Sequence, residues 1–163
     1  MLPDFFSLLK QPRQLLALGL GSGLSPKAPG TVGTIAAIPF YLLIALLPLP
    51  LQLLVIAISF GIGVYLCEFT ANDLGVHDHP AIVWDEFVGF WLTMLALPIM
   101  GEAVTLWWIL YGFILFRFFD IVKPWPIRWV DQKVSGGLGI MLDDMLAGIY
   151  SLICLGLLIS LLR

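Results

Sequence analysis

The sequence has very little charge for its length. Only 12% of its 163 residues are charged, whereas 60% are hydrophobic. A soluble domain has about a quarter charged residues. A water-soluble core of this size does not hide so much apolar surface, so we expect a lipid bilayer to cover it. The net charge of −3 leaves no basic surface of the kind that binds nucleic acid, and no nucleic-acid partner is expected.

Cysteine is also scarce, and no internal repeat is visible. Cys67 and Cys154 both lie inside apolar runs, which is typical of small buried side chains rather than of a disulfide framework. The segment 1–13 lacks an apolar run that ends at a small-residue cleavage site, so no removable signal peptide is expected. The length suits a single domain, which we expect to cover residues 1–163.

Five apolar segments predict an all-α membrane protein. They cover residues 32–47, 51–69, 87–100, 104–119 and 145–162. A membrane-spanning helix needs about 17–25 apolar residues. The second and fifth segments meet this length, whereas the others meet it only if their polar ends are counted, or else form a tilted or re-entrant pair. We therefore predict a polytopic helical bundle with four to five apolar helices.

The positions of the basic residues predict the orientation of this bundle. Before the first apolar segment stand Lys10, Arg13 and Lys27, and around the loop between the fourth and fifth stand Arg117, Lys123, Arg128 and Lys133. The turns at 48–50 and 98–103 contain no Lys or Arg. Positive residues favour the cytoplasmic side. The polar segments are therefore predicted to lie together at the cytoplasmic face of the membrane.

The first polar segment, residues 19–34, is rich in glycine and offers hydroxyl and ammonium donors without any carboxylate. Glycine permits close backbone approach, and the free N–H groups of a helix N-terminus favour an anion. Lys27 and Thr31 in this segment therefore indicate a phosphate-binding loop. A flexible loop in which Thr31 or Thr34 caps the following helix explains the pattern equally well.

The second polar segment, residues 68–86, contains several acidic residues and no Lys or Arg. A bound cation would relieve the repulsion among such carboxylates beside a membrane. Asp85 and Glu86 stand directly before an apolar helix, where the helix dipole alone favours acids, but two ionisable groups at the membrane boundary indicate function. His77 and His79 are either ligands or acid–base groups, or simply residues of a solvated loop.

The third polar segment, residues 117–128, combines charge with proline. Arg117 and Asp120 are three residues apart, so they share one helical face and are expected to pair. Pro124 prevents the helix from continuing and favours an extended backbone at Lys123. Lys123 is a candidate for contact with a phosphate group.

The fourth polar segment, residues 136–144, ends like the second in two adjacent carboxylates at the predicted start of an apolar helix. Glycines precede this pair of carboxylates. Asp143 or Asp144 could serve as an N-cap, but one cap needs only one of them. Carboxylate oxygens without cysteine favour Mg²⁺ or Mn²⁺ over zinc.

The absence of two motifs reduces the number of possible reaction mechanisms. The sequence contains neither a Cys-x5-Arg loop nor an Asp-x-Asp-x-Thr motif, so no cysteinyl or aspartyl phosphoenzyme is indicated. The mechanism that remains is direct attack on the phosphate by a metal-activated water. The competing hypotheses are a small cation-binding membrane transporter and a structural membrane subunit. Transporters tend to carry inverted repeats and broken helices near the midplane, whereas here the acids stand at predicted helix starts on one face.

Four motifs in fixed order carry a resemblance to a known family. They read GSGLSPKAPGTVGT, GVHDHPAIVWDEFVGFW, FRFFDIVKPWPIRW and GGLGIMLDDMLAG. Together they resemble phosphatidylglycerophosphatase A, over nearly the whole chain. The resemblance implies an all-helical, Mg²⁺-dependent enzyme of the bacterial inner membrane that hydrolyses the phospholipid phosphatidylglycerophosphate to phosphatidylglycerol and phosphate.

The resemblance and the chemistry together imply roles for individual residues. The metal ligands are drawn from Asp85, Glu86, Asp143 and Asp144. The substrate phosphate is bound by Lys27, Arg117 and Lys123, with the Thr31 hydroxyl. The catalytic carboxylates are Asp78, Asp85, Glu86, Asp120 and Asp144. Asp120 is either a further ligand or the partner of Arg117, and the general base is left open between Asp78 and Glu86.

Overall fold

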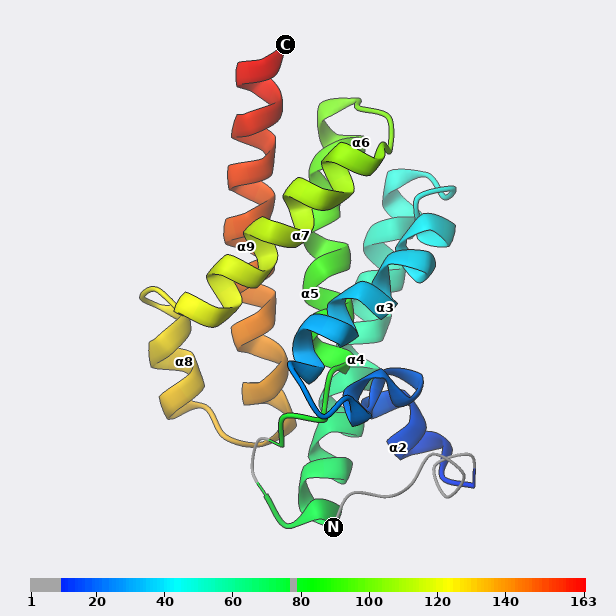
Figure 1. The fold of residues 1–163 in the computed structure, drawn as a ribbon, viewed down its shortest axis with the longest axis vertical. Helices are drawn as coiled ribbons and strands as arrows, with labels where there is room; N and C mark the ends of the chain where they lie inside the picture. Colours follow the sequence, from blue (N-terminus) through cyan, green and yellow to red (C-terminus); the bar gives the residue numbers. More distant parts are fainter. Residues whose placement is uncertain (1–9, 77–78) are drawn as a thin grey trace.

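The computed structural model describes residues 10–76 and 79–163, and within these ranges the chain forms helices and no strand (Figure 1). In chain order the elements are α2 (Pro12–Ala17), the 3₁₀ helix η1 (Gly19–Leu24), α3 (Pro29–Ile44), α4 (Leu49–Leu74), α5 (Trp84–Met94), α6 (Ala96–Met100), α7 (Leu106–Val122), α8 (Ile127–Lys133) and α9 (Gly136–Leu162). The prediction of an all-α fold is confirmed.

Two helices in the described part of the chain are long and apolar enough to cross a membrane, which is fewer than the four to five predicted. They are α4, with 26 residues, and α9, with 27 residues. The apolar run at 87–100 is divided between α5 and α6 at Leu95. At about 1.5 Å per residue, the 11 residues of α5 are much shorter than the ~30 Å hydrocarbon layer. The prediction was too high because a run of apolar residues does not reveal where a helix breaks.

Helix α9 packs against more of the fold than any other segment described. It contacts α4, α5, α6, α7 and α8. The core around it is filled by large apolar side chains that are almost completely buried, among them Phe87, Phe90, Met94, Phe116 and Leu155. α5 is buried on nearly all sides, since α3, α4, α7 and α9 surround it. The start of α5 is therefore held between its neighbours.

Glycine allows α5 and α9 to approach at backbone distance. A Cβ atom added at Gly148 would lie 2.6 Å from the carbonyl oxygen of Gly89, and one added at Gly89 would lie 2.8 Å from the carbonyl oxygen of Asp144. Real Cβ atoms do not approach backbone this closely, so neither position accepts a side chain without moving a helix. The pair brings the two helices together one turn beyond a carboxylate of each, since Gly89 follows Asp85 and Gly148 follows Asp144 by four residues.

Helix α9 begins earlier than the sequence predicts. It starts at Gly136, after Ser135 at the N-cap position, so Asp143 and Asp144 lie about two turns inside the helix and neither is its N-cap. The glycines suggested a loop because glycine is a poor helix former. They are instead required by packing, because a Cβ at Gly137 would lie 2.0 Å from the carbonyl oxygen of Val64 in α4.

Substitution of Gly137 should test this packing. In Gly137→Ala the new methyl group collides with α4, and we expect the free energy of unfolding to fall by about 1–3 kcal/mol, as in other overpacked contacts. Gly156→Ala, on the same helix, is the matched control. No atom lies within 4 Å of its added Cβ, and we expect a gain of up to about 1 kcal/mol. Thermal unfolding in detergent measures both, and equal stability of the two variants would contradict the packing.

Candidate active site

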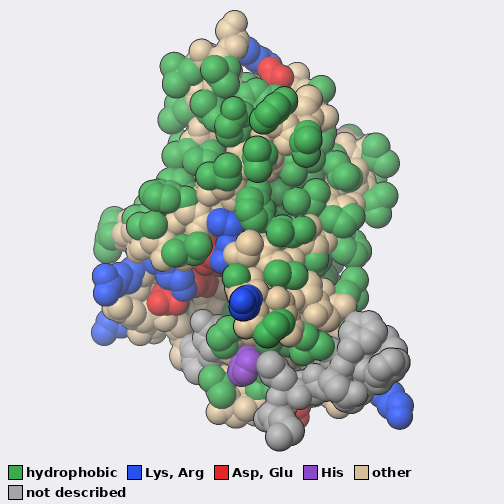
Figure 2. All heavy atoms as spheres, in the orientation of Figure 1, with side chains coloured by type: hydrophobic (Ala, Val, Ile, Leu, Met, Phe, Trp, Pro, Cys, Tyr) green, Lys and Arg blue, Asp and Glu red, His purple; other side chains and the backbone are tan. Residues whose placement is uncertain are grey.

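A polar cavity of about 300 Å³ opens where α3 and α5 begin and α7 ends, against the side of α9. It is lined by Ala28, Pro29, Gly30, Pro80, Ile82, Asp85, Glu86, Arg117, Asp120, Lys123, Asp143 and Asp144. Every charged residue in this lining was a candidate from the sequence. Figure 2 shows charged side chains gathered in the lower half of this face of the molecule, and hydrophobic side chains covering most of the upper half.

Two helices supply adjacent pairs of carboxylates to the cavity. Asp85 and Glu86 stand in the first turn of α5, where the helix dipole favours negative charge, as predicted. Asp143 and Asp144 come from within α9. Asp85 precedes Gly89 by four residues, and Asp144 precedes Gly148 by four. Each carboxylate is therefore one turn from the glycine contact and on the same helical face.

Three of these carboxylates converge. One oxygen each from Asp85, Glu86 and Asp144 lie within 4.8 Å of one another. The three residues are at most 9% exposed. Within the described residues, the buried oxygens Oε2 of Glu86 and Oδ2 of Asp144 have no hydrogen-bond partner. Burial raises the pKa of Glu86 well above its usual range, and the Asp144 carboxylate raises it further. Such a cluster strongly favours a bound cation over three bare charges.

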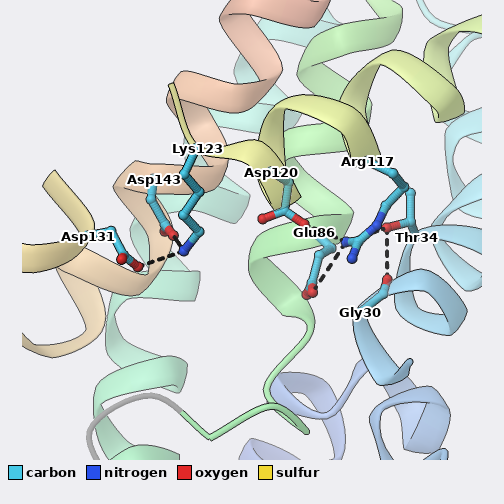
Figure 3. Close-up of polar contacts among 8 residues, drawn as sticks. All are labelled: Gly30, Thr34, Glu86, Arg117, Asp120, Lys123, Asp131 and Asp143. Carbon is cyan, nitrogen blue, oxygen red and sulfur yellow. Dashed lines mark hydrogen bonds and ion pairs between the residues drawn. The ribbon is translucent and has the colours of Figure 1, made fainter. Parts of the chain in front are cut away.

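Arg117 neutralises one side of the cavity. Its Nη1 lies 2.6 Å from Oδ2 of Asp120 and 3.7 Å from Oε1 of Glu86 (Figure 3). The same nitrogen donates a hydrogen bond to Oγ1 of Thr34 at 3.5 Å, and that hydroxyl donates to the carbonyl oxygen of Gly30 at 2.8 Å. The predicted Arg117–Asp120 pair is confirmed, and the contact with Thr34 ties α7 to the start of α3.

Gly30 makes room for this arrangement. A Cβ at this position would lie 2.2 Å from Oε1 of Glu86 and 3.1 Å from Nη1 of Arg117. The first turn of α3 therefore approaches the ion pair closely only because Gly30 has no side chain. The sequence indicated a glycine-rich phosphate loop, and the glycine of that loop that lines the cavity is Gly30.

Lys123 neutralises the carboxylates on the other side of the cavity. Its Nζ lies 2.6 Å from Oδ2 of Asp143 and 2.6 Å from Oδ1 of Asp131 (Figure 3). Burial alone would lower the pKa of Lys123, but the two carboxylates raise it above its usual value, so the ammonium stays charged. The prediction of an extended backbone at Lys123 is wrong. Helix α7 ends there with φ of 45°, a left-handed conformation that turns the chain before Pro124.

Some predicted site residues lie elsewhere. Lys27 is exposed and Thr31 is half-buried, and neither lines the polar cavity. Asp78 and His77 fall outside the described residues. His79 does not line the cavity either, and its Nδ1 accepts a hydrogen bond from the backbone N–H of Ala81.

Asp131 was missed from the sequence. It stands in α8, which turns back toward α9 after the end of α7, and it shares the ammonium of Lys123 with Asp143. Its separation from Lys123 by eight residues matches no helical contact, so no sequence pattern indicated the pair.

Comparison with known proteins finds one matching family model and several similar proteins. The family model described as Phosphatidylglycerophosphatase A matches residues 15–159. A phosphatidylglycerophosphatase A of Escherichia coli is 54% identical over 88% of this chain and 81% of its own length. The Haemophilus influenzae protein of the same name is 50% identical over 89% of this chain and 87% of its own. A Bacteroides thetaiotaomicron protein, named a candidate phosphatidylinositol-3-phosphatase, is 40% identical over 85% and 88%. No solved structure matches the chain.

Removal of the Arg117 guanidinium should destabilise the fold. In Arg117→Gln, the carboxylates of Glu86 and Asp120 lose their shared cation while they remain mostly buried, and we expect the free energy of unfolding to fall by about 3 kcal/mol. The matched control is Arg128→Gln, because Arg128 is exposed. Thermal unfolding in detergent without added divalent cations measures the difference. Equal melting temperatures for the two variants would rule out a structural contribution from Arg117.

Proposed function

The chain belongs to the phosphatidylglycerophosphatase A family, and from this premise we propose that it hydrolyses phosphatidylglycerophosphate to phosphatidylglycerol and phosphate in the polar cavity, with a bound Mg²⁺. The observation that carries the proposal is the convergence of three buried carboxylates next to two cationic side chains in one cavity. A phosphomonoester requires such an arrangement, because its negative charge must be neutralised while water attacks the phosphorus atom.

The residues present fit a hard divalent cation. Asp85, Glu86 and Asp144 would hold it, since their oxygens are close together and the cluster contains neither His nor Cys. Small side-chain movements would bring the three oxygens onto one ion. Asp143 and Asp120 lie on the rim of this cluster, each paired with its own cation. When bound, Mg²⁺ would lower the pKa of a water ligand and so supply a nucleophile at neutral pH.

The side chains of the cavity would bind the phosphate and accept the proton of the attacking water. Arg117 lies where its guanidinium would bind the substrate phosphate while Asp120 holds it in place. Lys123 lines the cavity with its ammonium charged, and it would neutralise a second phosphate oxygen. The attacking water loses a proton, for which Asp120 and Asp143 are available as acceptors in the same cavity. The P–O bond to glycerol breaks, and the departing oxygen takes up a proton to form the hydroxyl of phosphatidylglycerol.

We further propose that the protein is a multi-pass protein of the bacterial inner membrane with the cavity at the cytoplasmic face. α4 and α9 are its candidate spans, and the cavity lies beside the end of α9 where that helix begins. Lys123, Arg128 and Lys133 stand at that same end, as the positive-inside rule requires of a cytoplasmic face. Trp125, 79% exposed, lies next to them and is suited to the membrane–water interface.

The transporter hypothesis has less support. The acids meet in one cavity beside the ends of α3, α5 and α7, and the two that stand on a candidate span, Asp143 and Asp144, lie in the first part of α9. The relatives are also named as phosphatases. A binding site for a phosphomonoester explains Arg117 and Lys123, whereas a cation pathway does not explain two partly buried positive charges beside it.

Purified protein in detergent should release inorganic phosphate from phosphatidylglycerophosphate when Mg²⁺ is present. Excess EDTA should abolish this release, and restoring Mg²⁺ should recover it, because the carboxylate cluster would hold the ion reversibly. The measurement is phosphate released per minute under each condition. Full activity in EDTA after exhaustive dialysis would refute the metal proposal but not the phosphatase activity itself.

Single substitutions should identify the metal-binding carboxylates. Asp85→Asn and Asp144→Asn each remove one charged ligand, and we expect phosphate release at saturating Mg²⁺ to fall at least about 100-fold. Glu102→Gln is the matched control, because Glu102 pairs with Arg163 away from the cavity, and its activity should stay near that of the wild type. Thermal unfolding shows whether each variant is folded. Near-normal turnover by folded Asp85→Asn and Asp144→Asn would overturn the site assignment.

A further inference from the structure

A second cavity, the apolar groove, lies between α3 and α7, the two helices that Arg117 and Thr34 tie together. Its volume is about 250 Å³. It is lined by Ile35, Ile38, Leu106, Ile109, Leu110 and Phe113, all hydrophobic. Several of these side chains are strongly exposed, including Leu106 at 76% and Ile35 at 53%. The groove is therefore open at the surface and not filled by the protein's own core.

The apolar groove continues the polar cavity along the same helical faces. On α7, Phe113 precedes Arg117 by four residues, and Ile109 precedes Phe113 by four. On α3, Ile38 follows Thr34 by four residues. Residues four apart lie one above the other on a helix. The hydrogen bond from Arg117 to Thr34 therefore marks the boundary at which the space between α3 and α7 changes from charged to apolar.

We propose that the apolar groove binds one acyl chain of the phospholipid whose phosphomonoester occupies the polar cavity. The proposal rests on the proposed function, which requires an amphipathic substrate with its phosphate at Arg117. From Arg117 to Leu106 is eleven residues, about 16 Å along the helix, which accommodates much of an acyl chain. Figure 2 shows the corresponding change from charged to hydrophobic side chains on this face of the molecule.

A comparable groove on the other side of α7 lacks this continuity. It lies between α7 and α9, has a volume of about 340 Å³ and includes Ile114, Leu115 and Cys154. On α7 this groove comes as close to the cavity, since Ile114 precedes Arg117 by three residues, and the difference lies on the other helix. Cys154 is ten residues beyond Asp144, about 15 Å along α9. On α3, by contrast, the apolar groove begins at Ile35, five residues beyond Gly30 of the cavity lining, so the apolar groove comes close to the polar cavity on both of its helices.

Filling the apolar groove should change the preference of the enzyme for the length of the substrate's acyl chains. We expect Leu110→Trp to lower the ratio of kcat/KM for long-chain over short-chain phosphatidylglycerophosphate about tenfold or more, because excluding even one methylene group from a pocket costs about this much. Ile114→Trp, which places the same indole in the groove between α7 and α9, should leave the ratio unchanged. An unchanged ratio in Leu110→Trp, or an equal fall in Ile114→Trp, would overturn the proposal.

Photolabelling of the wild-type protein provides a second measurement that depends on neither turnover nor a variant that folds. The probe is phosphatidylglycerophosphate with a diazirine in one acyl chain, and the control is phosphatidylcholine with the same chain. We expect the first probe to label residues of the apolar groove several-fold more than the second. Equal labelling by both lipids, or labelling centred on α9, would overturn the proposal.

The two proposals fail in different ways. If the wild type releases no phosphate from either long-chain or short-chain substrate, the proposed function is wrong, and the labelling pattern still decides whether the apolar groove binds the chain of a phosphomonoester lipid. If phosphate is released at equal efficiency from both substrates and labelling does not distinguish the two lipids, the enzyme is a phosphatase that recognises the headgroup alone.

Discussion

The crowding of acids in one partly enclosed cavity is the constraint on which the rest of the structure depends. Five carboxylates line the polar cavity, with two cations, Arg117 and Lys123, among them. Each cation already pairs with carboxylates, at distances of 2.6 Å from Asp120 and from Asp143. Three carboxylates, from α5 and α9, converge beside these pairs, and Arg117 lies 3.7 Å from Glu86, one of the three. Placing bare charges in this way is costly, and this cost is the physical reason for proposing that they bind a positive ligand.

The geometry of the cluster depends on backbone contact between helices. Gly89 and Gly148 allow α5 and α9 to meet without side chains between them, and each stands one turn from a carboxylate of the cluster. Gly137 does the same between α9 and α4, and Gly30 allows the start of α3 to approach Glu86 and Arg117. These glycines weaken their helices individually. Their role is in packing, because the distances between the helix backbones set the distances between the carboxylates.

The polar cavity and the apolar groove share α3 and α7, which suits a substrate that is itself part charged and part apolar. The charged part of the site lies at the helix ends, where free N–H groups, loop residues and the turn at Lys123 can contribute. The apolar part lies farther along the same helices. A lipid phosphatase needs both, because its substrate belongs to the bilayer whereas the attacking water comes from the aqueous side.

The sequence by itself determined the all-helical class, the candidate site carboxylates and the Arg117–Asp120 pair. Apolar runs and three-residue spacing are local properties that can be found in the sequence. The candidate carboxylates were found because they belong to short sequence motifs. The number of long apolar helices was overestimated, since a helix break such as that at Leu95 depends on packing. The helical glycines of α9 were interpreted as a loop for the same reason. The tertiary structure was needed to show that Asp131 shares Lys123 with Asp143, that Lys27 does not line the cavity, and that Asp85, Glu86 and Asp144 converge. Those facts depend on distances between helices that are remote in the chain, and no local pattern encodes them.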